Sequence, residues 1–222
     1  MIQAAIFDMD GTLIDSEPMW KAAEQQVFGE LGVDVTDELA RETAAMTTKE
    51  VTEFWFERSP WTGKTLEQAE SEVIERVAVL IAESGKAMTG VDRILKFFAD
   101  KGLKIGLATN APEFLIPVVL EKLGIAHYFQ CYSSSDGEKQ GKPAPDVYLT
   151  TASKLAVEPC KCIAFEDTVT GVKSANNANM KSVVVPIASE YLDQKYDEAD
   201  LKLSCLSEFS DIHFQQLQSI SN

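Results

Sequence analysis

The chain has 222 residues, 45% of them hydrophobic, and its 35 acidic and 20 basic side chains give a net charge of −15. This is an ordinary globular composition, and at about 150 residues per domain the length allows one domain, or one domain that carries an insertion. The negative charge argues against binding to nucleic acids or anionic membranes, and no apolar run reaches the roughly 18 residues of a membrane-spanning helix.

The first residues carry no cationic segment before an apolar, strand-like run begins at Ala4. We therefore expect no secretory signal peptide and a cytoplasmic location. Four cysteines are too few for a disulfide framework in a chain of this size, which fits a reducing compartment. The sequence indicates no protein partner.

The chain order begins with a strand and a long helical stretch. Residues 4–7 are a short apolar run that ends at Asp8, typical of a buried parallel strand. Residues 17–84 show only the helical spacing of apolar side chains, with a loop at Pro60 and Gly63. The sequence therefore predicts an all-helical insertion after the first strand.

From residue 85 onward, helical and strand-like segments alternate. Helices are predicted at 91–98, 115–123, 148–155 and 172–179, and strands at 104–108, 128–132, 162–165 and 182–185. Such alternation predicts an α/β fold, a Rossmann-like parallel sheet with right-handed crossovers.

Polar, reactive side chains follow four successive predicted strands. In such a sheet ligands bind at the carboxyl ends of the strands, where these side chains should converge. They are Asp8 and Asp10 after the first strand, Thr109 and Asn110 after the second, Lys142 beyond the third, and Glu166 and Asp167 after the fourth.

This set suits phosphate chemistry. Clustered carboxylates repel one another unless a cation neutralises them, and hard oxygen donors without His or Cys favour Mg²⁺. Hydroxyl, amide and ammonium donors bind a phosphoryl group. One Asp carboxylate can act as the nucleophile and form an aspartyl-phosphate. A second carboxyl group two residues later can protonate the leaving oxygen and then activate water.

Each residue also has a structural interpretation. Asn110 could cap the following helix with Glu113, Lys142 could be a surface lysine, and Glu166–Asp167 could be an acidic helix start. Their order after four successive strands favours the functional interpretation of the whole set.

Other phosphatase chemistries fit poorly. His127 and His213 lie outside these loops, and no cysteine is followed by an Arg six residues later, which argues against zinc, His-nucleophile and Cys-nucleophile sites. Residues 160–162 have one residue between their cysteines instead of the two of a redox pair. Residues 137–142 match a P-loop only faintly, because the spacing is short and Pro143 replaces Ser or Thr.

These residues resemble the haloacid dehalogenase superfamily. Residues 7–18, FDMDGTLIDSEP, are similar to its first motif, Thr109 to its second, Lys142 in GKPAP to its third and Glu166–Asp167 to its fourth. The resemblance spans nearly the whole chain. It implies a helical cap domain at residues 17–84, as in β-phosphoglucomutase-like members, and a core made of residues 1–16 and 85–222. Residues 15–20 and 59–63 look most like hexitol-phosphate and 2-deoxyglucose-6-phosphate phosphatases of that group.

The resemblance also implies roles for the residues that match the motifs. It implies that Asp8 is the nucleophile and Asp10 the general acid and base. It further implies a Mg²⁺ ion held by Asp8, the Asp10 backbone carbonyl, Asp167 and Glu166, and a phosphoryl group held by Met9, Thr109, Asn110 and Lys142.

We therefore expect a Mg²⁺-dependent phosphatase of small sugar or sugar-alcohol phosphates, such as hexose or hexitol 6-phosphates, with a phosphosugar mutase as the alternative. The mutases carry a His ten residues after the Asp matched by Asp10, where this chain has Trp20, and often lack the Thr found here as Thr12. Both differences favour hydrolysis. Asp10 argues against dehalogenases, which lack it. A phospho-accepting signalling domain fits neither the Asp-x-Asp after the first strand nor the insertion.

The predicted cap offers candidate specificity contacts. They are Glu17, Trp20, Lys49 and Trp61, and for the last three, ordinary core or surface packing is an equal alternative.

Overall fold

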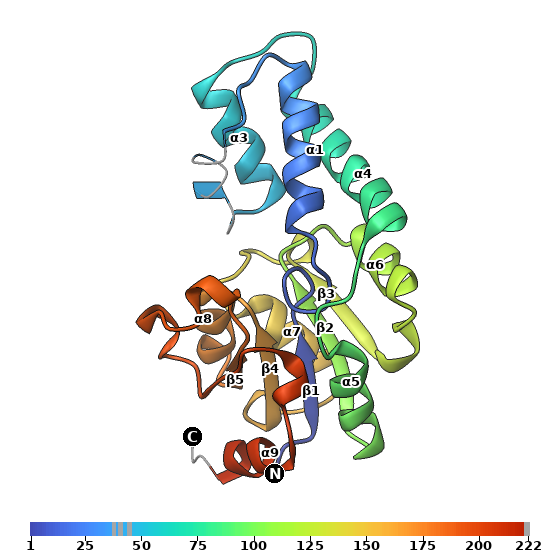
Figure 1. Cartoon of the computed structure of the whole chain (residues 1–222), viewed down its shortest axis with the longest axis vertical. Helices are drawn as coiled ribbons and strands as arrows, with labels where there is room; N and C mark the ends of the chain where they lie inside the picture. Colours follow the sequence, from blue (N-terminus) through green and yellow to red (C-terminus); the bar gives the residue numbers. More distant parts are fainter. Residues whose placement is uncertain (37–38, 40–41, 44–45, 220–222) are drawn as a thin grey trace.

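The computed structural model describes residues 1–219 except 37–38, 40–41 and 44–45, and Figure 1 shows the course of the chain. Its described part contains a six-stranded parallel sheet in the order β3-β2-β1-β4-β5-β6. The strands are β1 (Ala4–Phe7), β2 (Lys104–Thr109), β3 (Cys131–Ser134), β4 (Cys162–Glu166), β5 (Lys181–Val184) and β6 (Leu201–Lys202). The predicted α/β fold with a Rossmann-like parallel sheet is confirmed.

Helices precede or follow nearly every strand. They are α1 (Glu17–Glu30), α3 (Thr48–Arg58), α4 (Leu66–Ser84), α5 (Val91–Asp100), α6 (Leu115–Leu123), α7 (Asp146–Lys154), α8 (Val169–Asn177) and α9 (Asp211–Ser219). Between β1 and α5 the elements are the helices α1, α3 and α4, and the described residues of 17–84 contain no strand.

Helices cover both faces of the sheet. Along β1, Ala5 and Phe7 belong to one apolar cluster with the buried faces of α5, α6 and α9. Ala4 and Ile6 belong to a second cluster with α7 and α8. All four side chains of β1 are fully buried because each faces one of these two helical layers. The central strands are therefore fixed, and their carboxyl ends form a rigid edge.

The helices of segment 17–84 have clear local causes. Thr47 and Glu50 form a capping box at the start of α3, and Thr65 and Gln68 form one at the start of α4. The buried side chains of α4 recur every four residues, so one face of the helix packs against α1 and α3. Figure 1 shows α1, α3 and α4 standing beyond the carboxyl ends of the strands.

The end of α4 is tied to the core. Lys122 on α6 donates from Nζ to the carbonyl oxygens of Ala82 at 2.7 Å and Glu83 at 3.1 Å. A cation at the last turn of a helix satisfies carbonyl groups that have no partner within that helix. The helical segment is thus joined to the core through a side chain as well as through the backbone.

Some element bounds differ from the sequence prediction. The strand predicted at 128–132 is wrong in its first half: residues 126–128 form a 3₁₀ turn, and pairing with β2 starts at Cys131 opposite Gly106. Phe129, which follows this turn, packs edge-on against Phe7 at a centroid distance of 6.5 Å. The short β6 and the helix α9 were not predicted.

Candidate active site

The loop after β1 brings Asp8 and Asp10 to the carboxyl edge of the sheet. The Asp8 backbone N–H donates to the Phe165 carbonyl of β4 at 2.9 Å, so the residue stays in register with the sheet. Gly11 turns the chain with a φ of +73°, and a Cβ at this position would lie 2.1 Å from Oδ2 of Asp167. Only glycine meets both demands, the left-handed backbone and the close approach of Asp167.

Lys142 joins the loops in the interior of the site. Its Nζ donates to Asp8 Oδ1 at 2.5 Å, to Glu166 Oε1 at 2.6 Å and to the Ala108 carbonyl at 2.9 Å. Burial alone would lower the pKa of Lys142, but the charges of Asp8 and Glu166 outweigh it and raise the pKa above its ordinary value. Lys142 is therefore a permanent cation, and the alternative of a surface lysine is wrong, because the residue is 8% exposed.

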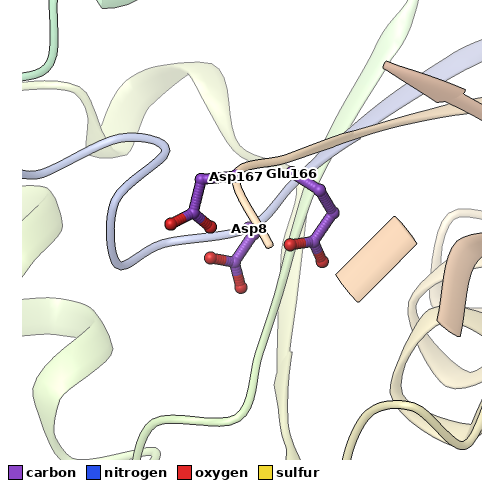
Figure 2. A group of neighbouring side chains, drawn as sticks. All are labelled: Asp8, Glu166 and Asp167. Atoms are coloured by element: carbon purple, nitrogen blue, oxygen red, sulfur yellow. The ribbon is translucent and has the colours of Figure 1, made fainter. Parts of the chain in front are cut away.

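Three carboxyl groups lie together beside this ammonium group. One oxygen from each of Asp8, Glu166 and Asp167 lies within 4.8 Å of the others, and Figure 2 shows their carboxyl groups side by side. Burial raises the pKa of all three, that of Glu166 to about 7, and for Glu166 and Asp167 the charge of Asp8 adds to the rise. Three carboxyl groups beside a single ammonium group leave negative charge uncompensated, and their oxygens are the hard donors that a divalent cation prefers.

Glu166 is held on both sides of its carboxyl group. Tyr148 Oη donates to Oε1 at 2.6 Å, the same oxygen that accepts from Lys142. On the other side, a Cβ at Gly171 would lie 1.9 Å from Oε2. The role of Tyr148 was not predicted from the sequence. A buried Tyr on a helix face normally has a hydrogen-bond partner for its hydroxyl, and this expectation could have pointed to a nearby polar group.

Asp10 accepts two hydrogen bonds on a single oxygen. The Ser16 hydroxyl and the Trp20 indole N–H, the latter at 3.1 Å, both donate to Oδ1. Burial raises the pKa of Asp10 to about 6. The hydrogen bond from Ser16 acts against this rise, and the negative charge of Asp8 adds to it. The sequence pointed to Trp20 only as a specificity contact and did not point to Ser16, because the path of the loop between Asp10 and α1 was not predictable.

The predicted phosphate-binding residues occupy different positions at this edge. Thr109 is 1% exposed, and its Oγ1 accepts from the Ala111 N–H at 3.0 Å. The Asn110 side chain accepts a hydrogen bond from the Lys142 backbone N–H at 2.8 Å and donates one to the Lys142 backbone carbonyl at 3.4 Å. This amide therefore joins the loop after β2 to the loop after β3. The Met9 side chain is buried in the core, and its backbone N–H bonds to Asp8.

The helix-cap interpretation of Asn110 is wrong. Helix α6 begins at Leu115, with Phe114 at its N-cap position and no side-chain cap. Glu113 instead donates its backbone N–H to Asp136 at 2.9 Å. Pro117 then falls in the first turn of α6, where proline is tolerated.

The candidate cap contacts separate into two kinds. Trp61 is 7% exposed and packs against Phe28 and Phe56 at centroid distances of 5.8 and 4.9 Å, so the packing alternative is correct for this residue. Glu17 and Lys49 are exposed.

Comparison with known proteins identifies the family. The haloacid dehalogenase-like hydrolase family model matches residues 2–179. The chain belongs to the haloacid dehalogenase-like hydrolases. The resemblance inferred from the motifs is thereby confirmed.

Individual relatives agree with this assignment. The chain is 38% identical over 211 residues to hexitol phosphatase B of Escherichia coli K12, covering 94% of this chain and 95% of that protein. It is 32% identical over 182 residues to a phosphorylated carbohydrates phosphatase of Thermotoga maritima, covering 82% and 84%. The crystal structure of β-phosphoglucomutase from Clostridium difficile has the same fold, with a TM-score of 0.84, 24% identity and coverage of 98% and 97%.

The protein is thus a phosphoric monoester hydrolase of this family. Within the described residues, no helix combines the length and the apolar character needed to span a membrane.

Proposed function

We propose that this protein is a Mg²⁺-dependent phosphatase that hydrolyses small sugar or sugar-alcohol phosphate monoesters through an aspartyl-phosphate on Asp8. The observation that carries the proposal is the position of Asp8 at the carboxyl edge of the sheet. Its Oδ1 is bound by Lys142 at 2.5 Å, and two further carboxyl groups lie beside it.

Asp8 has the properties of a nucleophile in this reaction. Its carboxyl group attacks the phosphorus atom, and the bond to the ester oxygen breaks. The three N–H groups of Lys142 bind Asp8, Glu166 and the Ala108 carbonyl, so a phosphoryl oxygen would have to replace one of these acceptors. The positive charge of Lys142 compensates charge that builds up beside Asp8 during transfer. The Thr109 hydroxyl and the Met9 backbone N–H supply neutral donors at the same edge.

Asp10 handles the protons of both half-reactions. It gives its proton to the leaving ester oxygen in the first step. In the second step it takes a proton from water as the water oxygen attacks phosphorus, the bond to Asp8 breaks and inorganic phosphate is released. Burial favours the protonated form that the first step requires.

The residues present fit a Mg²⁺ ion. Asp8, Asp167 and the Asp10 backbone carbonyl would hold it, with Glu166 in support, and all are hard oxygen donors. The absence of a Cβ at Gly11 leaves the room that the Asp167 carboxyl group occupies in this set. When bound, the ion would neutralise charge between these carboxylates and the phosphoryl oxygens.

The substrate class is supported by the relatives, which are named as phosphatases of hexitols and of phosphorylated carbohydrates. We also propose that residues 17–84 act as a cap domain over a core of residues 1–16 and 85–222. Helices α1, α3 and α4 stand over the strand ends and could exclude bulk water during transfer.

The test is phosphate release from a panel of sugar, sugar-alcohol and nucleotide monophosphates, with Mg²⁺ and with EDTA. We expect metal-dependent release that is fastest with hexose or hexitol 6-phosphates, and no release by Asp8→Asn, which controls for contaminating phosphatases. Every reaction is also examined for isomerised product. Conversion of a hexose 1-phosphate to its 6-phosphate without phosphate release would contradict the proposal in favour of a mutase.

A further inference from the structure

The end of the sheet opposite the candidate active site has a cavity of its own. Figure 1 shows the N-terminus and α9 at this end of the molecule, away from α1, α3 and α4. The cavity has a volume of about 240 Å³, and its walls come from the first residues of the chain, the turn before β4, the start of β5 and the last turn of α9. It shares no lining residue with the site around Asp8.

Lys181, the first residue of β5, lines the inner side of this cavity. Alternate residues of a strand face the same way, so Lys181 lies on the same face of the sheet as Val183. Val183 belongs to the apolar cluster that also contains Leu217 of α9, and Leu217 lines the cavity too. Because Lys181 is only 7% exposed, its methylene stem is covered and its ammonium group is the part that faces the cavity.

The ammonium group of Lys181 has no partner in the protein. Within the part of the chain that the structure describes, its Nζ takes part in no hydrogen bond or ion pair. Lys142, which is also buried, binds two carboxyl groups and a carbonyl. Burial of an unpaired charge is unfavourable, and lysine is rarely buried unless it is paired. A buried, unpaired ammonium group that faces a cavity therefore indicates an occupant of opposite charge.

The rest of the lining also suits an anion. Lys161, in the turn before β4, supplies a second cation, and no acidic residue is among the described residues that line the cavity. Glu158 pairs with Lys161 Nζ at 2.8 Å, but its side chain is 67% exposed. Because such exposed ion pairs contribute little stability, Lys161 can turn toward an anion in the cavity. Gln218 of α9 adds a neutral amide donor.

The size of the cavity favours a small ion. Pockets for drug-sized ligands have about 300–1,000 Å³, so this cavity would not enclose a whole sugar phosphate. We propose that Lys181 and Lys161 bind inorganic phosphate here, a small anion for which lysine is a common ligand. Phosphate is released by every phosphoric monoester hydrolase, so the ligand is the product of the protein's own reaction. This inference depends neither on the proposed sugar substrate nor on the role of Asp8.

Cys160 can report on the occupant, because it is a partly exposed free thiol that lines the cavity. Its thiolate displaces iodide from iodoacetate, an anion, and from iodoacetamide, which is neutral. Both rates are measured at Cys160 by peptide mass spectrometry, in EDTA, with sodium phosphate or with sodium chloride at the same ionic strength. We expect phosphate, but not chloride, to slow the reaction of Cys160 in a saturable way. The partly exposed Cys131 and Cys205 should react at unchanged rates.

Lys181→Met removes the charge and keeps an unbranched apolar side chain against α9. We expect this variant to lose the protection by phosphate. The ratio of the iodoacetate rate to the iodoacetamide rate at Cys160 should fall by about fivefold, the effect of one charge at contact distance in water. Lys173→Met is the matched control, since it removes one positive charge from an exposed position on α8 and should keep both properties. Lys161→Met provides a second variant if Lys181→Met does not fold, with the same losses expected.

Equal protection by phosphate in the wild type and in Lys181→Met would overturn the inference, and so would protection by chloride as strong as that by phosphate. Sorbitol 6-phosphate, added with EDTA to prevent hydrolysis, tests the source of the phosphate group. We expect it to protect Cys160 less than inorganic phosphate does. Equal protection would contradict the assignment to free phosphate in favour of the phosphoryl group of a metabolite.

Discussion

Glu166 shows how closely a single side chain in this site is fitted. Lys142 and Tyr148 hold one of its oxygens, and the backbone of α8 lies against the other, where Gly171 leaves room. Glycine is unfavourable inside a helix by about 1 kcal/mol relative to alanine, so its presence at this point of α8 has another cause. That cause is the space required by the Glu166 carboxyl group.

We predict that Gly171→Ala displaces Glu166, because the new Cβ would lie 1.9 Å from Oε2. Turnover should fall by about tenfold or more as Lys142 loses its alignment with Asp8. The matched control is Gly29→Ala in α1, where a Cβ would meet nothing within 4 Å. The control should gain about 0.5–1 kcal/mol in the free energy of unfolding and keep its turnover. Wild-type turnover in Gly171→Ala would contradict this account of Glu166.

At the scale of elements, the sequence predicted most of what positions the site. Buried strands such as Ala4–Phe7 are continuous apolar runs, and the side chains after them mark the carboxyl edge. The sequence did not reveal β6, which has two residues, or α9, whose apolar side chains are few. The helix predicted from residue 172 begins earlier, at Val169 of α8. Thr168 is its N-cap, because its hydroxyl accepts a hydrogen bond from the Gly171 N–H.

Contacts between elements were harder to predict than the elements themselves. The convergence of Asp8, Lys142 and Asp167 follows from strand order, because parallel strands align their carboxyl ends. The bonds from Ser16 and Trp20 to Asp10 depend on the angle at which α1 leaves its loop, and no local pattern encodes that angle.

Helix α1 also carries an acidic side chain that affects stability. Glu24 is 8% exposed, and burial raises its pKa to about 7, an effect that the Trp55 indole opposes in part. Between the ordinary pKa near 4.5 and the folded value, the folded state binds more protons than the unfolded state. The free energy of unfolding therefore falls as the pH rises from 4.5 to 7, by on the order of 3 kcal/mol for this group.

We predict that Glu24→Gln removes this decline. Denaturant unfolding at pH 5 and pH 8 should show a smaller difference in the free energy of unfolding for the variant than for the wild type. The exposed Glu30 on the same helix serves as control, and Glu30→Gln should keep the wild-type difference. An unchanged difference in Glu24→Gln would mean that Glu24 ionises normally in the folded protein.

At the scale of the whole molecule, the fold supplies a fixed edge and a helical segment above it. The sheet and the helices on its two faces fix Asp8, Lys142 and Asp167. Helix α1 reaches the same site through Trp20, and α4 is tied to the core through Lys122. We propose that this arrangement makes Asp8 the residue that carries the phosphoryl group between substrate and water.

The most direct measurement is an acid quench, within milliseconds, of the protein turning over sorbitol 6-phosphate with Mg²⁺, followed by mass spectrometry of the peptide that contains Asp8. We predict a phosphoryl group on Asp8 that is lost in alkali, as expected for an acyl phosphate, and that is absent from Asp8→Asn. Steady phosphate release with no phosphoryl group on Asp8, or with turnover preserved in Asp8→Asn, would contradict the account.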